Sequence, residues 1–416
     1  MVKKEKKQKV LFVANTGRFY HFERRKMKIL TDMGVEVHFA ANFTAAPIDR
    51  VDDTSIIKHQ LDCTRAPFSR KNWNAYQELK RLMGKERFDV VHCHTPVGGV
   101  LARLAACKYR KHGMKVIYTA HGFHFYKGGP KKYWAIFYPI EWVCSWLTDR
   151  LITINREDYV RAKKHFHASE VSYVPGVGID ITKYKPHLDG FSSLRAELGV
   201  NPDEYMLLSA GELTDRKNHE VVIRALALLH MPKIKYFICG IGPKEAFLRE
   251  LIKKNHLENN VYLLGFRNDI STLCQIADIY IFPSIQEGLS VALMEAMASE
   301  LPILCSDIRG NNDLVDNKKG GYRVLPHDVE QWTKAIKNMI ENHENWSDMG
   351  VYNRNKIATL FSVSKVLKEM KSIYASYLGN GTEEDIEFKA STSEETAAKS
   401  ICHLCSRGDD ASLHND

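Results

Sequence analysis

The chain has 416 residues, of which 44% are hydrophobic and 26% are charged, and its formal net charge is +9. This composition is typical of a soluble globular protein. The length exceeds the ~250–300 residues that one hydrophobic core serves, so two domains are expected. No apolar run approaches the ~20 residues of a membrane-spanning helix, and the run that begins at Val10 is too short for a signal peptide. We therefore expect a cytoplasmic protein.

The charge is unevenly distributed along the chain. Residues 381–416 contain nine acidic and three basic residues, a net charge of −6, so residues 1–380 carry +15. A basic body favours a polyanionic partner such as a phosphate-bearing substrate, an anionic lipid surface or nucleic acid, and a merely solvated basic surface explains it equally well. The acidic segment 379–416 is rich in Ser, Thr and Glu and is predicted to be disordered.

Short apolar runs alternate with helical patterns through the first half of the chain. The predicted strands are 10–14, 35–41, 89–93, 116–120 and 149–155. The predicted helices are 22–33, 73–83 and 99–112. This alternation is typical of a parallel sheet that is covered by helices on both faces.

The alternation starts again after a turn-rich segment at 175–180. The predicted strands are 205–210, 235–239, 261–264, 279–282 and 302–305. The predicted helices are 220–229, 246–254, 270–275 and 289–298, and residues 332–378 have a helical pattern throughout. The sequence therefore predicts an α/β protein with two Rossmann-like doubly wound parallel-sheet domains, 1–180 and 181–356, that face a central cleft. Ligands of such sheets bind beyond the carboxyl ends of the strands.

The most informative segment is the turn and helix that follow the fourth predicted strand of the second half. Glu287 lies in the turn, and Glu295 lies eight residues later in an otherwise apolar helix that is predicted to begin near Gly288. The two carboxylates are separated by about 12 Å along the helix. The free N–H groups at the helix start suit a phosphate, and they belong to Gly288, Leu289 and Ser290.

A nucleotide sugar fits this order of groups. Its sugar would lie on Glu287, its diphosphate on the helix start, and its ribose on Glu295. A purely structural interpretation, in which Glu287 caps the helix and Glu295 meets a buried arginine, explains the two carboxylates equally well when they are taken alone.

Two earlier turns contain glycines at the ends of predicted strands. Gly211 ends the first strand of the second half, and Arg216 and Lys217 open the next helix, where they could hold a diphosphate or form a solvated charged loop. Gly240 and Gly242 form a tight turn between the following strand and helix. The third glycine of a dinucleotide fingerprint is missing, so a NAD dehydrogenase fits poorly.

These motifs together resemble glycosyltransferase family 4, and the likeness covers roughly residues 8–378. It rests on Glu287 and Glu295 with seven residues between them, and on the strand, loop and helix around Gly211 and Lys217. Three further segments are similar. Residues 264–270, which include Arg267, look like the family segment around the nucleotide base, and residues 118–125 and 149–158 look like the bacterial capsule and exopolysaccharide branch.

The resemblance implies a fold of the GT-B type. The first domain would bind the acceptor, the second would bind a nucleoside-diphosphate sugar, and no metal ion or other cofactor would be needed. Residues 357–378 would cross back to the first domain. Two positions depart from the family pattern: Glu212 stands where arginine is common, and Gly17 is a single glycine where many members have two.

His121 is the first domain's candidate for a catalytic group. It follows a predicted strand and precedes Gly122, so it should lie at the cleft, where a neutral imidazole can bind a donor-sugar hydroxyl. A turn histidine with satisfied hydrogen bonds is the alternative. Gly17 and Asn155 follow neighbouring strands and are candidates on the acceptor side.

No metal site is predicted. His92 and His94 end a strand, but Cys93 between them should point to the opposite face of the sheet. Cys402 and Cys405 have only half of a zinc-site spacing.

A run of aromatic residues follows the His121 segment and alternates with lysines. Aromatic and basic residues together can lie at a membrane interface, and a core helix of the first domain is the favoured alternative. The residues concerned are Trp134, Phe137, Tyr138, Trp142 and Trp146, beside Lys127, Lys131 and Lys132.

From these observations we predict a retaining, metal-independent glycosyltransferase of capsule or exopolysaccharide synthesis. It would move a hexose or N-acetylhexosamine from a UDP-sugar to a lipid-linked saccharide, in contact with an anionic membrane and with no nucleic acid partner. The catalytic residues would be His121, Glu287, Arg216 and Lys217. A UDP-sugar epimerase of the same fold and a noncatalytic assembly partner are the alternatives.

Overall fold

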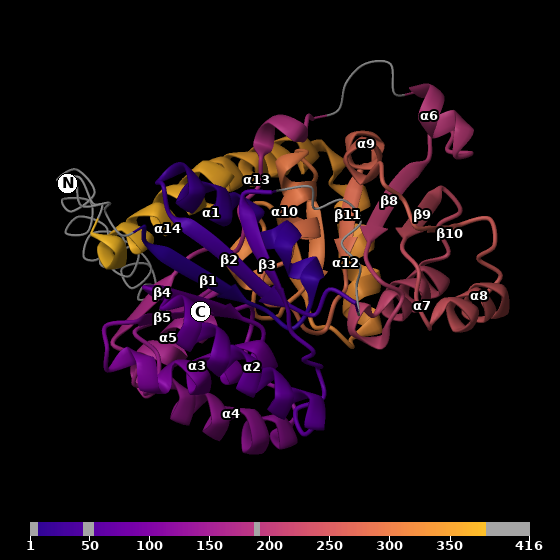
Figure 1. The fold of residues 1–416 in the computed structure, drawn as a ribbon. Helices are drawn as coiled ribbons and strands as arrows, with labels where there is room; N and C mark the ends of the chain where they lie inside the picture. Colours follow the sequence, from indigo (N-terminus) through magenta and orange to yellow (C-terminus); the bar gives the residue numbers. More distant parts are fainter. Residues whose placement is uncertain (1–6, 45–53, 187–191, 380–416) are drawn as a thin grey trace, which may run out of the picture.

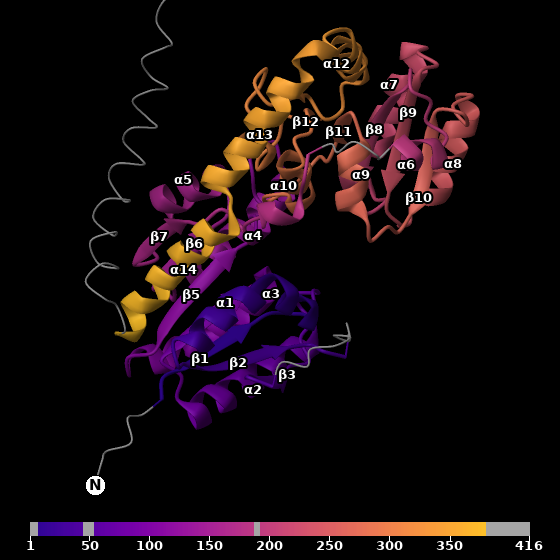
Figure 2. The same cartoon turned by 90° about the horizontal axis from the view of Figure 1, so that it is seen from above.

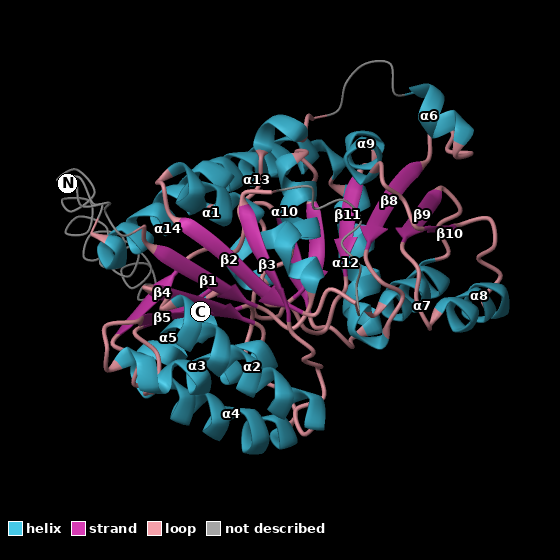
Figure 3. Cartoon of the chain, in the orientation of Figure 1, coloured by secondary structure: helices cyan, strands magenta, loops and turns pink. Residues whose placement is uncertain are grey.

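The computed structural model describes residues 7–44, 54–186 and 192–379. The predicted disordered segment, apart from Gly379, and the pair Cys402 and Cys405 lie outside these residues. The described chain forms two parallel β-sheets, each flanked by helices on both faces (Figures 1 and 3). The predicted pair of doubly wound α/β domains is therefore confirmed.

The first sheet has seven parallel strands. In spatial order they are β3 (Ile56–Gln60), β2 (Glu36–Ala41), β1 (Lys9–Val13), β4 (Val90–His94), β5 (Lys115–Ala120), β6 (Arg150–Thr153) and β7 (Glu170–Tyr173). The central strands β1 and β4 are almost entirely buried, which explains their continuous apolar runs.

The second sheet has six parallel strands. In spatial order they are β10 (Val261–Gly265), β9 (Ile234–Cys239), β8 (Tyr205–Ala210), β11 (Ile279–Phe282), β12 (Ile303–Ser306) and β13 (Gly321–Val324). The strand order reverses between β8 and β11, and in sheets of this kind the ligand crevice lies at such a reversal.

Helices cover both faces of each sheet. Those of the first domain are α1 (Tyr20–Asp32), α2 (Arg70–Glu86), α3 (Pro96–Arg110), α4 (Lys131–Ser145) and α5 (Arg156–His165). Those of the second domain are α6 (Ser192–Glu197), α7 (His219–Leu229), α8 (Glu245–Lys254), α9 (Ile270–Ile276), α10 (Val291–Ala298), α11 (Asn311–Leu314), α12 (Val329–Glu341) and α13 (Trp346–Leu360). Side-chain caps define several starts, such as Ser69 for α2 and Asp328 for α12.

The last helix, α14 (Val363–Leu378), belongs to the first domain although it follows the second in sequence. Figure 2 shows α13 and α14 as one run that leads from the second domain onto the first. α13 still contacts α10, and Ile357 and Phe361 lie in the second core, whereas α14 packs against α1. The crossing thus occurs near Ser362, and the continuous helical pattern of 332–378 is interrupted twice, after α12 and after α13.

Glu369 on α14 lies in an environment that disfavours its charged form. Its Oε2 atom is buried without a hydrogen-bond partner among the described residues. Burial raises the pKa of this carboxyl to about 7, although Lys365 opposes the shift. The folded protein therefore binds a proton more tightly here than the unfolded chain does, and this contribution to stability is lost as the pH rises from about 4.5 to about 7.

We expect Glu369→Gln to remove this pH dependence. We compare the unfolding free energy of the variant with that of the wild type at each pH. The difference, variant minus wild type, should be about 2 kcal/mol more positive at pH 8 than at pH 5. Urea denaturation at both values measures the difference. If the difference in unfolding free energy between variant and wild type were the same at pH 5 and pH 8, Glu369 would have an ordinary pKa in the folded protein.

Candidate functional site

The carboxyl ends of strands from the two sheets meet at the cleft. Gly288, after β11, lies against the carbonyl of His121, after β5, and a Cβ atom added at Gly288 would collide with that oxygen. Only glycine permits this close approach of two backbones. The turn predicted to bind a donor and the histidine predicted to bind a sugar are thus neighbours across the cleft.

Glu287, Arg216 and Lys217 form a compact charged cluster on the second domain. Glu287 Oε1 accepts hydrogen bonds from Arg216 Nη1 at 2.7 Å and from Lys217 Nζ at 2.8 Å. Burial lowers the pKa of the Lys217 ammonium, and Glu287 opposes this shift. Without a ligand the carboxylate thus partly neutralises both cations, and a diphosphate could compete with it for them.

The helix after Glu287 begins later than predicted. α10 starts at Val291 rather than near Gly288, because Ser290 is its N-cap and its Oγ accepts from the Leu293 amide at 3.3 Å. The Leu289 side chain belongs to the core of the second domain. Only the backbone of Leu289 could therefore serve a ligand, and the Ser290 hydroxyl already serves the helix.

Glu295 faces a cavity between the domains. Its Oε1 accepts a hydrogen bond of 2.6 Å from the Tyr184 hydroxyl, and burial raises its pKa while this bond opposes the rise. The cavity has a volume of about 210 Å³ and is bounded by α1, by residues 177–184 of the linker between the two domains, and by α10. Its basic lining residues are His21, Arg24, Arg25 and Lys183. In such a cavity the carboxylate can accept hydrogen bonds from the hydroxyl groups of a nucleotide, and the cations can bind its phosphate groups.

The other predicted donor residues lie in adjacent loops at the edge of the second sheet. The Gly240 amide donates to the Gly265 carbonyl at 2.7 Å, and a Cβ atom at Gly240 would collide with the Gly211 carbonyl. A Cβ atom at Gly242 would likewise collide with the backbone of Leu213. Arg267, just after β10, forms an ion pair with Asp269. The structure thus brings these four residues to one rim of the cleft.

His121 is partly exposed at the cleft and lies beside an aromatic and a second histidine. Its Nε2 is 3.2 Å from His94 Nδ1, and its ring meets that of Phe19 edge-on. Burial lowers the pKa of His121 to about 4, so the ring is neutral at neutral pH. The predicted neutral imidazole at the cleft is consistent with this environment.

A buried charged network lies behind His121. Glu23 and Lys26 on α1 form an ion pair of 3.0 Å, and Glu23 lies 3.8 Å from His94 Nε2. Burial disfavours ionisation of Glu23, but Lys26 and the nearby histidines outweigh it and lower the pKa of Glu23. His92 bonds to Tyr374 of α14 at 2.8 Å. Glu23 and His94 therefore form the immediate support of His121.

Two groups of side chains in the described part of the chain could offer three metal ligands each. They are Glu23, His94 and His121, and Glu36, His38 and Glu86. In each group a lysine ammonium lies within 3.0 Å of a carboxylate, Lys26 in the first and Lys9 in the second. A cation is already supplied in both places, so neither group favours a divalent ion.

The predicted acceptor-side residues are placed differently from one another. Gly17 begins a short 3₁₀ turn after β1, and its amide donates to the Asn42 carbonyl at 2.9 Å. Asn155 is fully buried, caps α5 by accepting from the Asp158 amide at 2.9 Å, and donates to the Asp158 carboxylate. Asn155 can therefore affect the cleft through Asp158 and not by touching an acceptor.

Arg309 is a central residue of the site that the sequence did not reveal. It follows β12, yet its Nη1 donates to Asp158 Oδ1 and to the Phe123 carbonyl of the first domain, both at 2.9 Å. Its Nε donates to the Glu287 carbonyl at 3.2 Å. Burial raises the pKa of Asp158, and Arg309 opposes that shift. Arg309 thus joins the two domains next to Glu287 and His121.

Comparison with known proteins identifies this architecture. The models "Glycosyl transferase 4-like" and "Glycosyl transferases group 1" match residues 9–155 and 191–356. EpsD of Bacillus subtilis, named as a glycosyltransferase, is 36% identical over 384 residues, which cover 91% of this chain and 99% of EpsD. The chain belongs to glycosyltransferase family 4. The resemblance inferred from the spaced glutamates is confirmed.

Other relatives and solved structures agree with this assignment. The UDP-Gal:alpha-D-GlcNAc-diphosphoundecaprenol alpha-1,3-galactosyltransferase of Escherichia coli is 28% identical over 74% of this chain and 81% of its own length. HepE of Anabaena, solved with UDP and glucose, has a TM-score of 0.72 at 18% identity, over 89% of this chain and 100% of HepE. This structural likeness confirms the predicted GT-B fold.

Proposed function

We propose that this glycosyltransferase moves a hexose or N-acetylhexosamine from a UDP-sugar to a lipid-linked saccharide in capsule or exopolysaccharide synthesis, with retention at the anomeric carbon. The proposal rests on one observation above all. Glu287, which binds Arg216 and Lys217, is followed directly by Gly288, and the backbone of Gly288 is in contact with that of His121. A sugar bound beside this contact would meet carboxylate, imidazole and cations together.

Different residues would bind different parts of the donor. Glu287 would hold sugar hydroxyls, Glu295 the ribose hydroxyls, and Arg216 and Lys217 the diphosphate. These two cations would stabilise the charge on the leaving group, as a metal ion does in other transferases. His121, which is neutral, would orient a sugar hydroxyl.

For retention we favour attack from the face that the diphosphate leaves. The acceptor oxygen bonds to the anomeric carbon as the bond to the diphosphate breaks, and the departing phosphate oxygen takes the acceptor proton. Glu287 is a weak candidate for a covalent nucleophile, because two cations within 2.8 Å stabilise its negative charge.

Relatives support the donor and the acceptor classes. The name of the Escherichia coli galactosyltransferase specifies a UDP-sugar donor and a sugar linked to diphosphoundecaprenol. AmsK of Erwinia amylovora is named as a glycosyltransferase of amylovoran biosynthesis. In this chain the cations Arg216 and Lys217 beside Glu287 suit a diphosphate. A peripheral place on the cytoplasmic face of the membrane follows for an enzyme with a lipid-linked acceptor. The described residues contain no helix long and apolar enough to cross a bilayer.

A thermal-shift panel tests the donor site. Purified protein is melted without metal in the presence of UDP, GDP, ADP, several UDP-sugars and NAD. Ligand at about 100 times its dissociation constant adds about 2.7 kcal/mol of stability, which corresponds to a rise of about 5–10 °C in Tm for domains of this size. We expect this rise with UDP or UDP-sugars and a much smaller one in Glu295→Ala.

The matched control is Glu250→Ala, at an exposed position within helix α8. It should melt and respond to UDP as wild type does. Conversion of a UDP-sugar to its isomer without any acceptor would favour the epimerase, and no response to any nucleotide would favour the noncatalytic partner.

A further inference from the structure

Helix α4 has an exposed apolar face on the outside of the first domain. The aromatic run predicted in this region divides between two sides of the helix. Trp134, Phe137 and Tyr138 pack against the core of the first domain. The outward side carries large apolar side chains with the exposed fractions Ile136 47%, Ile140 37%, Trp142 39%, Val143 54% and Trp146 58%. We call these five residues the α4 face.

The spacing of these residues makes the α4 face continuous. Ile136, Ile140 and Val143 follow one another at intervals of four and three residues, and Trp142 and Trp146 form a neighbouring row. The one acid of the helix, Glu141, is buried against Arg103 at 2.8 Å. A helix that is apolar on two opposite sides normally lies inside a core or in lipid, yet Ile136, Ile140 and Val143 remain 37–54% exposed, and His167 covers only part of Trp142 and Trp146.

The surroundings of the α4 face are strongly basic. Residues 96–169 contain thirteen lysines and arginines and four acids. None of the four acids is exposed, because Glu141, Asp149 and Asp158 are buried and Glu157 is half-buried. Lys127, Lys131 and Lys132 are exposed at the start of α4. Within this segment the apolar face is therefore accompanied by cations without exposed acids, and the exposed acid that follows it, Glu170, is paired with Arg150.

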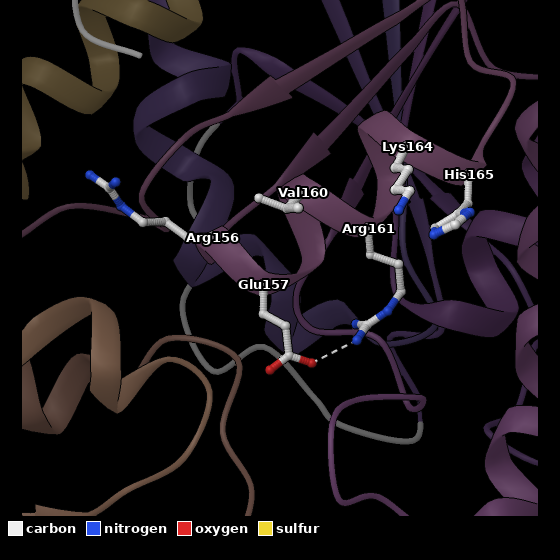
Figure 4. Close-up of a pocket in the computed structure, with 6 residues that line it drawn as sticks. All are labelled: Arg156, Glu157, Val160, Arg161, Lys164 and His165. Atoms are coloured by element: carbon white, nitrogen blue, oxygen red, sulfur yellow. Dashed lines mark hydrogen bonds and ion pairs between the residues drawn. The ribbon is translucent and has the colours of Figure 1, made fainter. Parts of the chain in front are cut away.

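The neighbouring helix α5 extends this basic border. Figure 4 shows Arg156, Lys164 and His165 along α5, with Arg161 linked to Glu157. These residues line an open hollow of about 460 Å³. His167, just after α5, stacks on Trp146 with ring centroids 4.0 Å apart. The basic end of α5 and the aromatic end of α4 are thus in contact.

The α4 face is also connected directly to the active cleft. The segment 121–130 leads from His121 to the first turn of α4, and Trp134 Nε1 donates to the Tyr126 carbonyl within that connection. Tyr126 in turn lies beneath the guanidinium of Arg309, 4.9 Å from ring centroid to Cζ. Anything that binds to the α4 face would therefore lie close to the acceptor side of the cleft.

We propose that the α4 face and its border of lysines dock on an anionic lipid bilayer. The five apolar side chains would enter the interfacial region, while Lys127, Lys131 and Lys132 contact lipid phosphates. The charge around the face fits an anionic lipid surface, whereas an interface between copies of the chain would bring like charges together. The choice of a bilayer rests in part on the lipid-linked acceptor of the proposed function.

Sedimentation with vesicles tests the docking surface on the full chain, without donor or acceptor, so the outcome is independent of the proposed chemistry. The vesicles are phosphatidylcholine alone or a mixture with 30 mol% phosphatidylglycerol. We expect binding to the anionic vesicles that weakens at high salt. Val143→Glu should lower the affinity at least tenfold, and the double variant Lys131→Ala/Lys132→Ala by about thirtyfold, since each basic residue near an anionic surface contributes about fivefold.

Matched controls lie on the second domain. Val351 on α13 is 46% exposed, so Val351→Glu makes the same change at a similar helical position, and Lys253→Ala/Lys254→Ala removes an exposed lysine pair from α8. Both should bind vesicles within twofold of wild type. The lysine variants change only exposed side chains, so they keep the test decisive if Val143→Glu does not fold.

Three results would overturn the proposal. The first is no preference for anionic over neutral vesicles. The second is equal losses in the α4 variants and their controls. The third is a dimer in light scattering that Val143→Glu dissociates, which would make the α4 face a contact between two copies.

Discussion

Replacing Glu287 by glutamine should lower kcat/KM for glycosyl transfer by about 10²–10³-fold, the usual effect of removing one preorganised electrostatic group. Glutamine keeps the size of the side chain but loses the charge that holds Arg216 and Lys217 at 2.7 and 2.8 Å. The pKa of Lys217 should then fall further, because burial would act on it without the opposing carboxylate. Turnover of a labelled sugar nucleotide measures the effect.

Glu245→Gln is the control for this variant. Glu245 also pairs with an arginine, Arg249 at 2.7 Å, but on the exposed surface of α8. Its replacement should leave kcat/KM within twofold of wild type. If Glu287→Gln kept more than a third of the activity, the charged cluster would not be the centre of the reaction.

Replacing Arg309 by methionine should cost about 3–5 kcal/mol of unfolding free energy at pH 8. The change removes the cation 2.9 Å from the buried Asp158 and leaves it the longer contact with Arg161 at 3.4 Å, and breaking a buried ion pair by removing one partner is destabilising by about this amount. Burial already raises the pKa of Asp158 in the wild type. Loss of Arg309 raises it more, so the variant gains stability relative to wild type as the pH falls and Asp158 becomes protonated.

Urea denaturation at pH 8 and pH 5 checks the size and the sign of this effect. The double variant Arg309→Met/Asp158→Asn should recover part of the loss, because it removes the unpaired charge. Arg249→Met, in the exposed pair with Glu245, should cost less than about 1 kcal/mol. Equal losses for the two single variants would mean that the contact between Arg309 and Asp158 does not stabilise the fold.

The sequence was most informative where burial is complete. Strands such as β1 and β8 are covered on both faces, so they appear as uninterrupted apolar runs. The strands that the sequence analysis missed lie at the edges of the sheets: β3 and β7 on the first and β13 on the second. β3 has only one buried residue in five, so it gives no such run.

The residues of the site likewise divide into those that the sequence reveals and those that it does not. Glu287 and Glu295 were found because their spacing within one turn and helix is a local signal. Arg309 has no local motif, and its carboxylate partner lies 151 residues away in the other domain. The pairing of Glu287 with Arg216 likewise joins residues 71 positions apart. The first contact arises when the two domains meet and the second when two strands of one sheet become neighbours, and neither arrangement gives a local signal in the sequence.

The return of α14 to the first domain has a consequence for synthesis on the ribosome. Val366, Met370, Ile373, Tyr374 and Leu378 belong to the same core as β1 and α1. The chain from the linker to α14 is about 200 residues long, which takes roughly 10–40 s to translate at the usual rates. The domain that emerges first is thus completed last, and the face of its sheet that α14 shares with α1 is only partly covered while the second domain is being made.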